Sequence, residues 1–255
     1  MLAGPDHLYG KLNLGTMSTE RLTFGIHNFV PGKRHDMHAH PTWEQFYYVI
    51  SGQARIEVAD EEAIVGPGGT AYLPPTVKHA FEPAGDQSLE IVLAMAVLDQ
   101  TGPDGQVVPI TSLPEQKPAS GTGFRYIHAP DHHIPRFEGY SDKTIPDAKT
   151  QAGDSLVHAG PDALYADLRL GNFSSIRLTF GVHHYRPGLE HDLHAHPTWE
   201  QFYYVISGQA RVTVGDEEQV IGAGGSAYLP AGVPHGFKSV GDETLVMALT
   251  GCVLD

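Results

Sequence analysis

Cysteine is almost absent from this sequence, since Cys252 is the only one among 255 residues. A single thiol cannot form an internal disulfide, and its place in an apolar stretch predicts buried packing. Basic residues are scarce as well: 16 lysines and arginines face 30 acidic residues, which gives a net charge of −14. A chain of this charge repels nucleic acid and anionic membrane surfaces, so we expect neither as a partner.

Long apolar runs are missing too. No uninterrupted stretch approaches the roughly 18 residues of a membrane span, and the first residues lack the basic start and apolar run of a signal peptide. We therefore expect a soluble, cytoplasmic protein with no membrane contact.

Glycine, proline and histidine are plentiful. The 29 glycines and 19 prolines are typical of a chain with many turns between short strands. Apolar residues make up 41% of the sequence, which is enough for a packed core. The 16 histidines equal the lysines and arginines in number, and this excess is a first indication of metal chemistry.

An internal repeat organises the chain. At an offset of 156 residues, positions 21–99 align without a gap to positions 177–255, with about 49 identities in about 79 positions. The match continues more weakly upstream. The repeat predicts an N-terminal domain at 1–99 (the first repeat) and a C-terminal domain at 157–255 (the second repeat). The proline-rich segment 100–156 between them has no counterpart and reads mostly as loop, with short strands possible at 106–110 and 124–128.

Within each repeat the local signals are those of β-structure. In the first repeat, apolar and β-branched runs bounded by turn residues predict strands at 21–29, 45–50, 55–58, 70–73 and 89–95. No segment shows helical periodicity over three turns. Short strands at even spacing predict an all-β fold of the jelly-roll or barrel type.

Three histidines in each repeat have the spacing of metal ligands. Two of them are separated by one residue, so on a strand they point to the same face, and the third follows a glycine- and proline-rich turn further on. Three imidazoles suit a divalent transition metal and leave positions open for water or substrate. The candidate ligands are His38, His40 and His79 in the first repeat and His194, His196 and His235 in the second.

These residues resemble the two sequence motifs of the cupin superfamily. The first motif, a glycine, His-x-His, an acidic residue and a closing glycine, is matched at 32–52, and the second, glycine, Pro-x-Gly and histidine, is matched loosely at 68–79 and closely at 224–235. The resemblance implies a bicupin, with two tandem double-stranded β-helix (jelly-roll) barrels. It also implies one divalent transition metal per barrel, which can be Fe, Ni, Zn, Co or Mn.

The sequence departs from the cupin pattern at the fourth ligand. The family's carboxylate position holds Gln45 and Gln201, and Glu44 and Glu200 stand next to them. Neighbouring strand residues face opposite sides, so only one of each pair can point inward, and the spacing to Gly52 favours the glutamine. Four neutral ligands would leave the metal its full charge as a Lewis acid.

Two further pairs of residues are candidates for catalysis. Asp36 and Asp192 lie two positions before the first histidine of each repeat, so parity places them inward, in reach of a proton-transfer role, if the strand already runs there; a turn or strand-entry aspartate is the interpretation that we prefer. By the same parity Tyr47 and Tyr203 share the face of the glutamines, where they can donate hydrogen bonds to a substrate or simply pack the barrel.

We therefore expect a metal-dependent enzyme that acts on a small anionic organic molecule by isomerase, lyase or ring-opening chemistry. An Fe(II)-dependent dioxygenase is the alternative, because three imidazoles also hold ferrous iron with room for oxygen. A third hypothesis is a storage or ligand-binding cupin without catalysis. A homodimer is compatible with the sequence.

Overall fold

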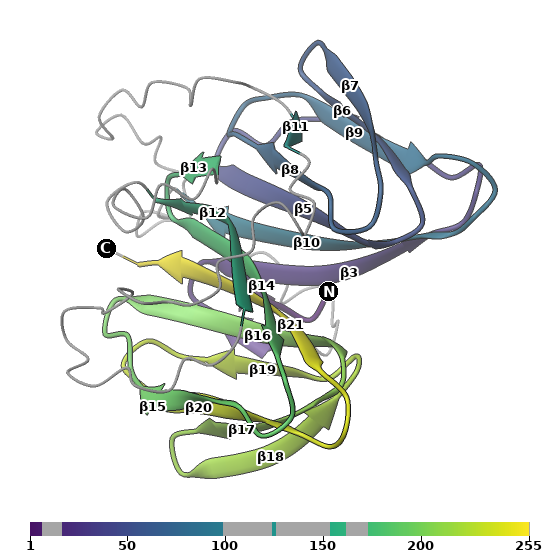
Figure 1. Cartoon of the computed structure of the whole chain (residues 1–255). Coiled ribbons are helices and arrows are strands. Elements are labelled where there is room, and N and C mark those ends of the chain that lie inside the picture. Colours follow the sequence, from purple (N-terminus) through teal and green to yellow (C-terminus); the bar gives the residue numbers. More distant parts are fainter. Residues whose placement is uncertain (7–16, 99–123, 126–153, 162–172, 255) are drawn as a thin grey trace. The chain divides into compact units, whose positions relative to one another are not determined.

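The computed structural model describes residues 1–6, 17–98, 124–125, 154–161 and 173–254, and almost all of its regular structure is β-strand (Figure 1). The all-β prediction is therefore confirmed. In the central segment 100–156, one of the two expected short strands is present as β11 (Phe124–Arg125), which pairs with β8 (Thr70–Leu73). The other, at 106–110, lies outside the described residues.

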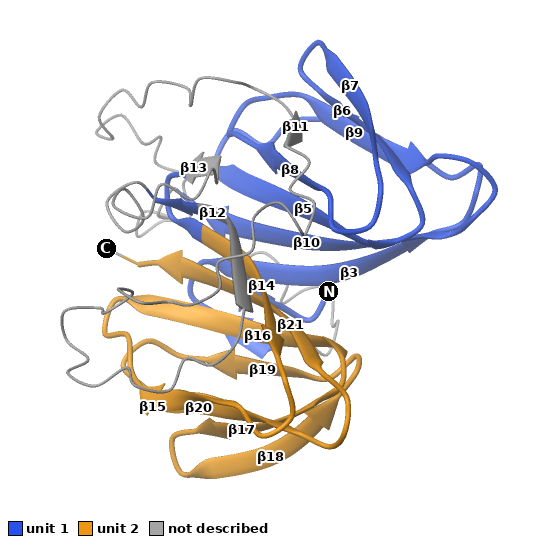
Figure 2. Cartoon of the chain, viewed as in Figure 1, with its two compact units in different colours: residues 1–128, 158–178 blue, residues 129–157, 179–255 orange. Residues whose placement is uncertain are grey.

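The chain divides into two compact units (Figure 2). Unit 1 comprises residues 1–128 and 158–178, and unit 2 comprises residues 129–157 and 179–255. The boundary between the units does not follow the boundary between the repeats. Residues 158–178 belong to the second repeat in the sequence, but in space they group with unit 1. The linear boundaries 1–99, 100–156 and 157–255 stay a prediction.

The first repeat forms two sheets. The larger sheet has the order β11-β8-β5-β10-β3-β1-β2, and the smaller one has the order β4-β9-β6-β7. Besides β8 and β11, their strands are β1 (Ala3–Pro5), β2 (Met17–Thr19), β3 (Leu22–Phe29), β4 (His35–His38), β5 (Trp43–Ser51), β6 (Ala54–Val58), β7 (Glu61–Val65), β9 (His79–Pro83) and β10 (Leu89–Val97).

The second repeat reproduces this topology at the offset of 156. Its sheets have the orders β13-β12-β14-β21-β16-β19 and β15-β20-β17-β18. Its strands are β12 (Asp154–Pro161), β13 (Phe173–Ser175), β14 (Leu178–Tyr185), β15 (Glu190–His194), β16 (Trp199–Ser207), β17 (Gln209–Val214), β18 (Glu217–Gly222), β19 (Ser226–Leu229), β20 (His235–Val240) and β21 (Leu245–Val253). The parallel pairs β1–β2 and β12–β13 have equivalent registers, so the structural repeat reaches the start of the first repeat.

The five strands expected from apolar runs in the first repeat are present, and β7 is one of the strands that those runs did not predict. β7 reads Glu-Glu-Ala-Ile-Val and its first two side chains are exposed, so its sequence carries little apolar signal. It is a strand because it pairs along its full length with β6. Pairing partners, rather than local composition, determine such edge strands.

Strand β5 positions the site residues of the first repeat. It lies between β8 and β10, and its side chains alternate between two faces. Tyr47 and Val49 belong to the apolar core of the first repeat, together with Ile56, Phe81 and Met95. Gln45 shares their face by parity, whereas Glu44 and Phe46 occupy the opposite face.

The structure explains why the first cupin motif ends with a glycine in both repeats. Gly52 adopts a φ of +76°, and a Cβ atom there would overlap the backbone oxygen of Ser88. Gly208 has a φ of +75°, and its Cβ would lie 2.7 Å from the backbone oxygen of Thr244. Both the conformation and the close approach require glycine, so the turn after β5 keeps its register.

No helix in the described part of the chain combines the length and the apolar character needed to cross a membrane.

Candidate metal centres

The structure brings the three predicted histidines of the first repeat together in unit 1. His38 ends β4, His79 begins the neighbouring β9, and His40 follows two residues after His38. Their ring centroids are 4.4 to 5.4 Å apart. One potential ligand atom from each side chain lies within 4.8 Å of the other two. We call this set the first cluster.

The second repeat builds an equivalent set in unit 2, the second cluster, from His194, His196 and His235. The ring centroids are 4.5 to 5.4 Å apart. The Nε2 atoms of His194 and His196 are only 3.0 Å apart, so both nitrogens are directed at the same region. The spacing of these histidines in the sequence therefore corresponds to proximity in space in both repeats.

Backbone carbonyls determine which ring nitrogen is available for a metal. Nδ1 of His38 lies 2.7 Å from the carbonyl oxygen of Asp36, and Nδ1 of His79 lies 2.9 Å from that of Val77. The corresponding distances for His194 and His235 are 2.7 and 2.8 Å. Because a carbonyl oxygen only accepts, Nδ1 carries the proton in the neutral ring, and Nε2 is then the unprotonated nitrogen that can bind a metal.

Burial favours the neutral form, which a metal requires, at His40, His79 and His235. Desolvation lowers the pKa of His79 and of His235 to about 4, with nearby histidines adding to the effect. Desolvation and the neighbouring His38 and His79 lower the pKa of His40 to about 4 as well. The ring of His40 stacks on Trp43, with centroids 4.8 Å apart, and His196 stacks on Trp199 in the same way.

Unpartnered buried atoms show that both clusters fit a metal ion. Nε2 of His79 and Nε2 of His235 are buried and have no hydrogen-bond partner among the described residues. The Oε1 atoms of Gln45 and Gln201 are likewise buried and have no hydrogen-bond partner among the described residues. Such atoms cost free energy unless a ligand satisfies them. The donor set, imidazole nitrogen with amide oxygen, is one that divalent transition metals accept.

Gln45 is held by a contact that the second repeat lacks. Its Nε2 donates to the Sδ atom of Met95 at 2.7 Å, which leaves Oε1 as the free acceptor. The position equivalent to Met95 is Gly251, where a Cβ atom would lie 2.8 Å from Oγ1 of Thr179. Gln45 and Gln201 are 2% and 7% exposed.

Glu44 has a different role from its neighbour. Its carboxylate is fully buried and accepts hydrogen bonds from the hydroxyl of Tyr72 at 2.6 Å and from the backbone N–H groups of Ile176, Arg177 and Leu178 at 2.6 to 2.8 Å. Desolvation raises its pKa, and these hydrogen bonds oppose that rise. Glu44 therefore holds the residues that enter β14, which belong with it to unit 1. Glu200 is also fully buried and accepts from the hydroxyl of Tyr228 at 2.7 Å.

The parity that favoured an inward Asp36 does not hold in the structure. A register shift between His35 and His38 breaks the alternation of β4, and the side chain of Asp36 is exposed. The same shift occurs between His191 and His194, where Asp192 is half-buried. The backbone oxygens of the two aspartates accept from the first histidine of each cluster. A proton-transfer role for the carboxylates stays a prediction.

The same bulge moves another histidine beside each cluster. The ring of His35 stacks on Phe81 with centroids 5.0 Å apart and lies 4.5 Å from the ring of His38. His191 has equivalent contacts to Phe237 and His194. The ligand spacing in the sequence selects neither His35 nor His191. Their recurrence in both repeats was the signal that could have identified them.

Tyr47 and Tyr203 lie next to the clusters, on the face expected for them. Their ring centroids are 6.2 Å from His79 and 6.3 Å from His235. Both side chains are buried, and desolvation raises the pKa of each hydroxyl, so both remain protonated and able to donate.

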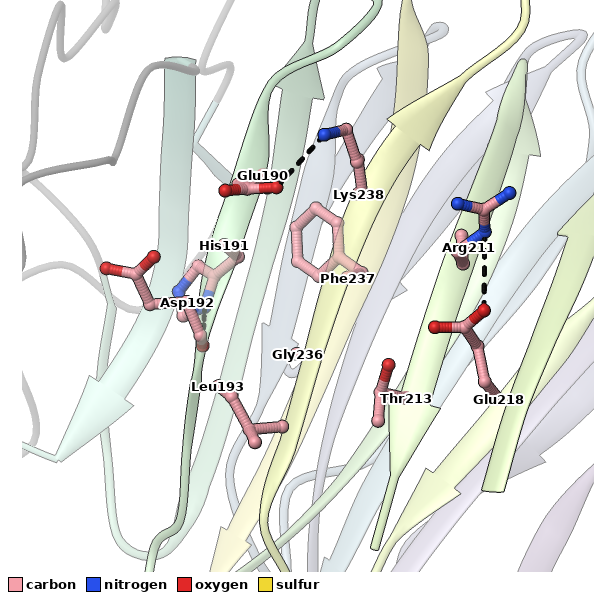
Figure 3. Close-up of a pocket in the computed structure, with 10 residues that line it drawn as sticks. All are labelled: Glu190, His191, Asp192, Leu193, Arg211, Thr213, Glu218, Gly236, Phe237 and Lys238. Atoms are coloured by element: carbon pink, nitrogen blue, oxygen red, sulfur yellow. Dashed lines mark hydrogen bonds and ion pairs between the residues drawn. The ribbon is translucent and has the colours of Figure 1, made fainter. Parts of the chain in front are cut away.

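A separate groove of about 340 Å³ lies on the smaller sheet of unit 2 (Figure 3). In it Lys238 reaches Glu190 at 3.2 Å and Arg211 reaches Glu218 at 3.5 Å, so charges of opposite sign are paired within it. The three histidines of the second cluster are not among its lining residues. The lining consists of Glu190, His191, Asp192, Leu193, Arg211, Thr213, Glu218, Gly236, Phe237 and Lys238.

Comparison of the sequence with known families gives two matches to the same domain. The family described as "Cupin domain" matches residues 25–95 and again residues 181–251, which together make up more than half of the chain. Two curated relatives match short stretches. An uncharacterized protein of Streptomyces coelicolor is 36% identical over 50 residues, and one of Methanocaldococcus jannaschii is 33% identical over 61 residues. These stretches are 20% and 24% of this chain, and they span about half the length of each relative (48% and 49%).

Solved structures support the arrangement of two tandem barrels. A structure of Bacillus subtilis oxalate decarboxylase, a protein with Mn(II) centres, matches 93% of this chain and 70% of its own with a TM-score of 0.62 and 18% identity. A second structure of that enzyme, at pH 4.6, matches 92% of this chain and 68% of its own with a TM-score of 0.58 and 20% identity. At such identities the likeness shows the fold alone.

Proposed function

The chain belongs to the cupin domain family, and from this premise we propose that it is a metal-dependent enzyme acting on small organic anions. One divalent transition metal would be held in each repeat, by His38, His40, His79 and Gln45 in the first and by His194, His196, His235 and Gln201 in the second.

One observation carries this proposal: in each repeat, a buried nitrogen of the histidine cluster and a buried oxygen of the candidate glutamine have no partner among the described residues. These atoms are the Nε2 and Oε1 atoms of His79 and Gln45, and of His235 and Gln201. Two copies of one such arrangement, at equivalent positions of a repeat, are not expected from packing alone, because each unpaired atom costs about 1–3 kcal/mol. A divalent ion removes this cost in both places.

The surrounding residues favour an anionic substrate. All four proposed ligands are neutral, so a bound ion keeps its charge of +2 and supplies Lewis-acid stabilisation to carboxylate or enolate oxygens. The hydroxyls of Tyr47 and Tyr203 stay protonated and can donate a hydrogen bond to a substrate oxygen. The rings of Trp43 and Trp199 restrict the orientation of His40 and His196. Asp36 and Asp192 are retained as candidates for proton transfer.

The fold likeness suggests the first substrate to test. The solved neighbours include an enzyme named for the decarboxylation of oxalate, which is a small dianion of the kind that the proposal requires. We propose Mn(II) as the first metal for the same reason, with Fe, Ni, Zn and Co as alternatives.

The test combines elemental analysis with turnover. The full chain, loaded with Mn(II), is expected to hold close to two metal ions and to consume oxalate or a related small carboxylate without stoichiometric oxygen uptake. Oxygen uptake matching turnover would favour the dioxygenase alternative. Two bound metals without turnover of any carboxylate or diketone would favour a ligand-binding cupin, and a chain that binds no metal would refute the proposal.

A further inference from the structure

The face of β5 that carries Gln45 lies beside the first cluster. Trp43 and Tyr47 stand two positions before and after Gln45, so the three side chains share this face. The ring centroid of Trp43 is 4.8 Å from that of His40, and the ring centroid of Tyr47 is 6.2 Å from that of His79. The Gln45 amide is therefore flanked by two residues that contact the cluster.

Gln45 and Met95 are partners on neighbouring strands. Their Cα atoms are in register between β5 and β10, and both side chains are buried. Nε2 of Gln45 donates to Sδ of Met95 at 2.7 Å, while Oε1 of the same amide is buried and has no hydrogen-bond partner among the described residues. One end of the amide is thus held by the sulfur, and the other end remains for a ligand.

The sulfur selects one of the two orientations of this amide. A thioether only accepts hydrogen bonds, and of the two ends of an amide only the NH₂ group donates. A rotation of the amide by half a turn would bring Oε1 against Sδ, so that two acceptors would be in contact. It would also direct the NH₂ group, which cannot bind a cation, to the place of Oε1. Met95 therefore favours the orientation of Gln45 that a metal requires.

The second repeat shows that the fold itself does not require a methionine at this position. The register partner of Gln201 is Gly251, which has no side chain to accept from the amide. A Cβ atom at Gly251 would lie 2.8 Å from Oγ1 of Thr179 and 3.3 Å from Cγ of Gln201. Because an equivalent barrel forms with glycine there, Met95 is a feature of the first repeat's own sequence.

We propose that Met95 is a positioning residue of the first metal centre: its sulfur holds the Gln45 amide so that Oε1 is free to bind the metal of the first cluster. This inference rests on the proposed function, since it assigns a role within the metal site that the function requires. A ligand that is oriented before the metal arrives loses less conformational freedom on binding, and this raises the affinity.

The experiment measures Mn(II) affinity at the first centre alone. His194→Ala together with His196→Ala removes the second cluster from the full chain and gives the parent for all comparisons. Met95→Leu, Gln45→Glu and the two changes together are made in this parent, and each chain is titrated with Mn(II) in a calorimeter. We expect Met95→Leu to weaken Mn(II) binding about fivefold, because leucine is similar in volume but accepts no hydrogen bond.

Gln45→Glu provides the matched background. A carboxylate has two equivalent acceptor oxygens, so it has no orientation for a sulfur atom to select. With Gln45→Glu present, we expect Met95→Leu to change Mn(II) binding by less than about twofold. Met95→Gln supplies an amide oxygen as acceptor and should keep the affinity within about twofold of the parent. Met247→Leu changes a buried methionine of the second repeat and should leave the first centre unaltered.

Two results would overturn the inference and leave the proposed function standing. One is full Mn(II) affinity in the Met95→Leu chain. The other is an equal loss of affinity from Met95→Leu whether residue 45 is glutamine or glutamate, because Met95 would then act through packing alone. A wild-type chain that binds no metal would instead refute the proposed function.

Discussion

Gln45 and Glu44 are adjacent in the sequence and have separate environments in the structure. The Gln45 amide directs a free Oε1 atom into the core face, whereas the Glu44 carboxylate accepts hydrogen bonds from one hydroxyl and three backbone N–H groups. Strand alternation separates them, as expected from the spacing to Gly52. The assignment of the glutamine as fourth ligand is a prediction that substitution can test.

Replacing Gln45 with alanine is expected to weaken metal binding in the first repeat at least about tenfold, because it removes one of four ligands, and to leave the second repeat loaded. Replacing Glu44 with alanine should keep the metal. It should lower the free energy of unfolding by about 2–4 kcal/mol, since buried N–H groups lose their acceptor. Metal content and urea denaturation measure the two effects. Metal loss from Glu44→Ala, but not from Gln45→Ala, would reverse the assignment.

At the scale of elements, the turn before β9 is the clearest difference between the repeats. Thr76 has a φ of +67°, a conformation that β-branched residues rarely adopt, and its counterpart Gly232 has a φ of +76°. The backbone N–H of Thr76 donates to the carbonyl oxygen of His40 at 2.9 Å, and that of Gly232 donates to His196 at the same distance. The turn therefore links the third histidine to the segment that carries the other two.

Thr76→Gly is expected to stabilise the protein by about 1 kcal/mol, because relief of backbone strain exceeds the entropy cost of glycine. The melting temperature should rise by about 2–4 °C. The reverse change in the other repeat, Gly232→Thr, should lower it. Calorimetry on both variants checks this, and metal content should stay the same. A lower melting temperature for Thr76→Gly would show that Thr76 contributes more by packing than it costs in strain.

At the scale of the whole molecule, buried histidines make stability depend on pH. Burial lowers the pKa of His27, His40, His79 and His235 to about 4. In the unfolded chain each returns to its ordinary value near 6.5, so between pH 6.5 and 4 the unfolded state binds more protons than the native state. The stability of the metal-free protein should therefore be complete above pH 6.5 and fall as the pH decreases toward 4.

Urea denaturation of the metal-free protein between pH 7.5 and 4.5 measures this dependence. Each such histidine contributes a slope of up to about 1.4 kcal/mol per pH unit. His27→Asn, which changes a histidine outside both clusters, should reduce the slope and leave metal content unchanged. A midpoint that stays constant from pH 7.5 to 5 would contradict the expectation.

The sequence by itself determined the features that depend on residue identity and local spacing. The offset of 156 indicated two equivalent repeats, strand runs bounded by glycine and proline predicted the all-β fold, and the spacing of histidines indicated which side chains meet. Alternation along β5 explains why Gln45 and Glu44 occupy opposite faces, whereas His40 lies beyond the end of β4 and meets His38 without sharing a strand with it. The closing glycines were visible as members of the cupin motif, and the structure gives the reason: Gly52 and Gly208 combine a positive φ with a backbone contact that leaves no room for a Cβ atom.

Tertiary structure decided what depends on neighbours distant in the sequence. The bulge in β4, which exposes Asp36 and brings His35 beside the first cluster, comes from pairing with β9 and leaves no local mark. The burial of Glu44 requires residues 176–178, more than a hundred positions away. Tyr47 and Tyr203 are distant in the sequence from His79 and His235, and only packing brings each tyrosine ring to 6.2 to 6.3 Å from the third histidine of its cluster. Register shifts and long-range contacts depend on strands that are far apart in the sequence, so the local residue pattern does not predict them.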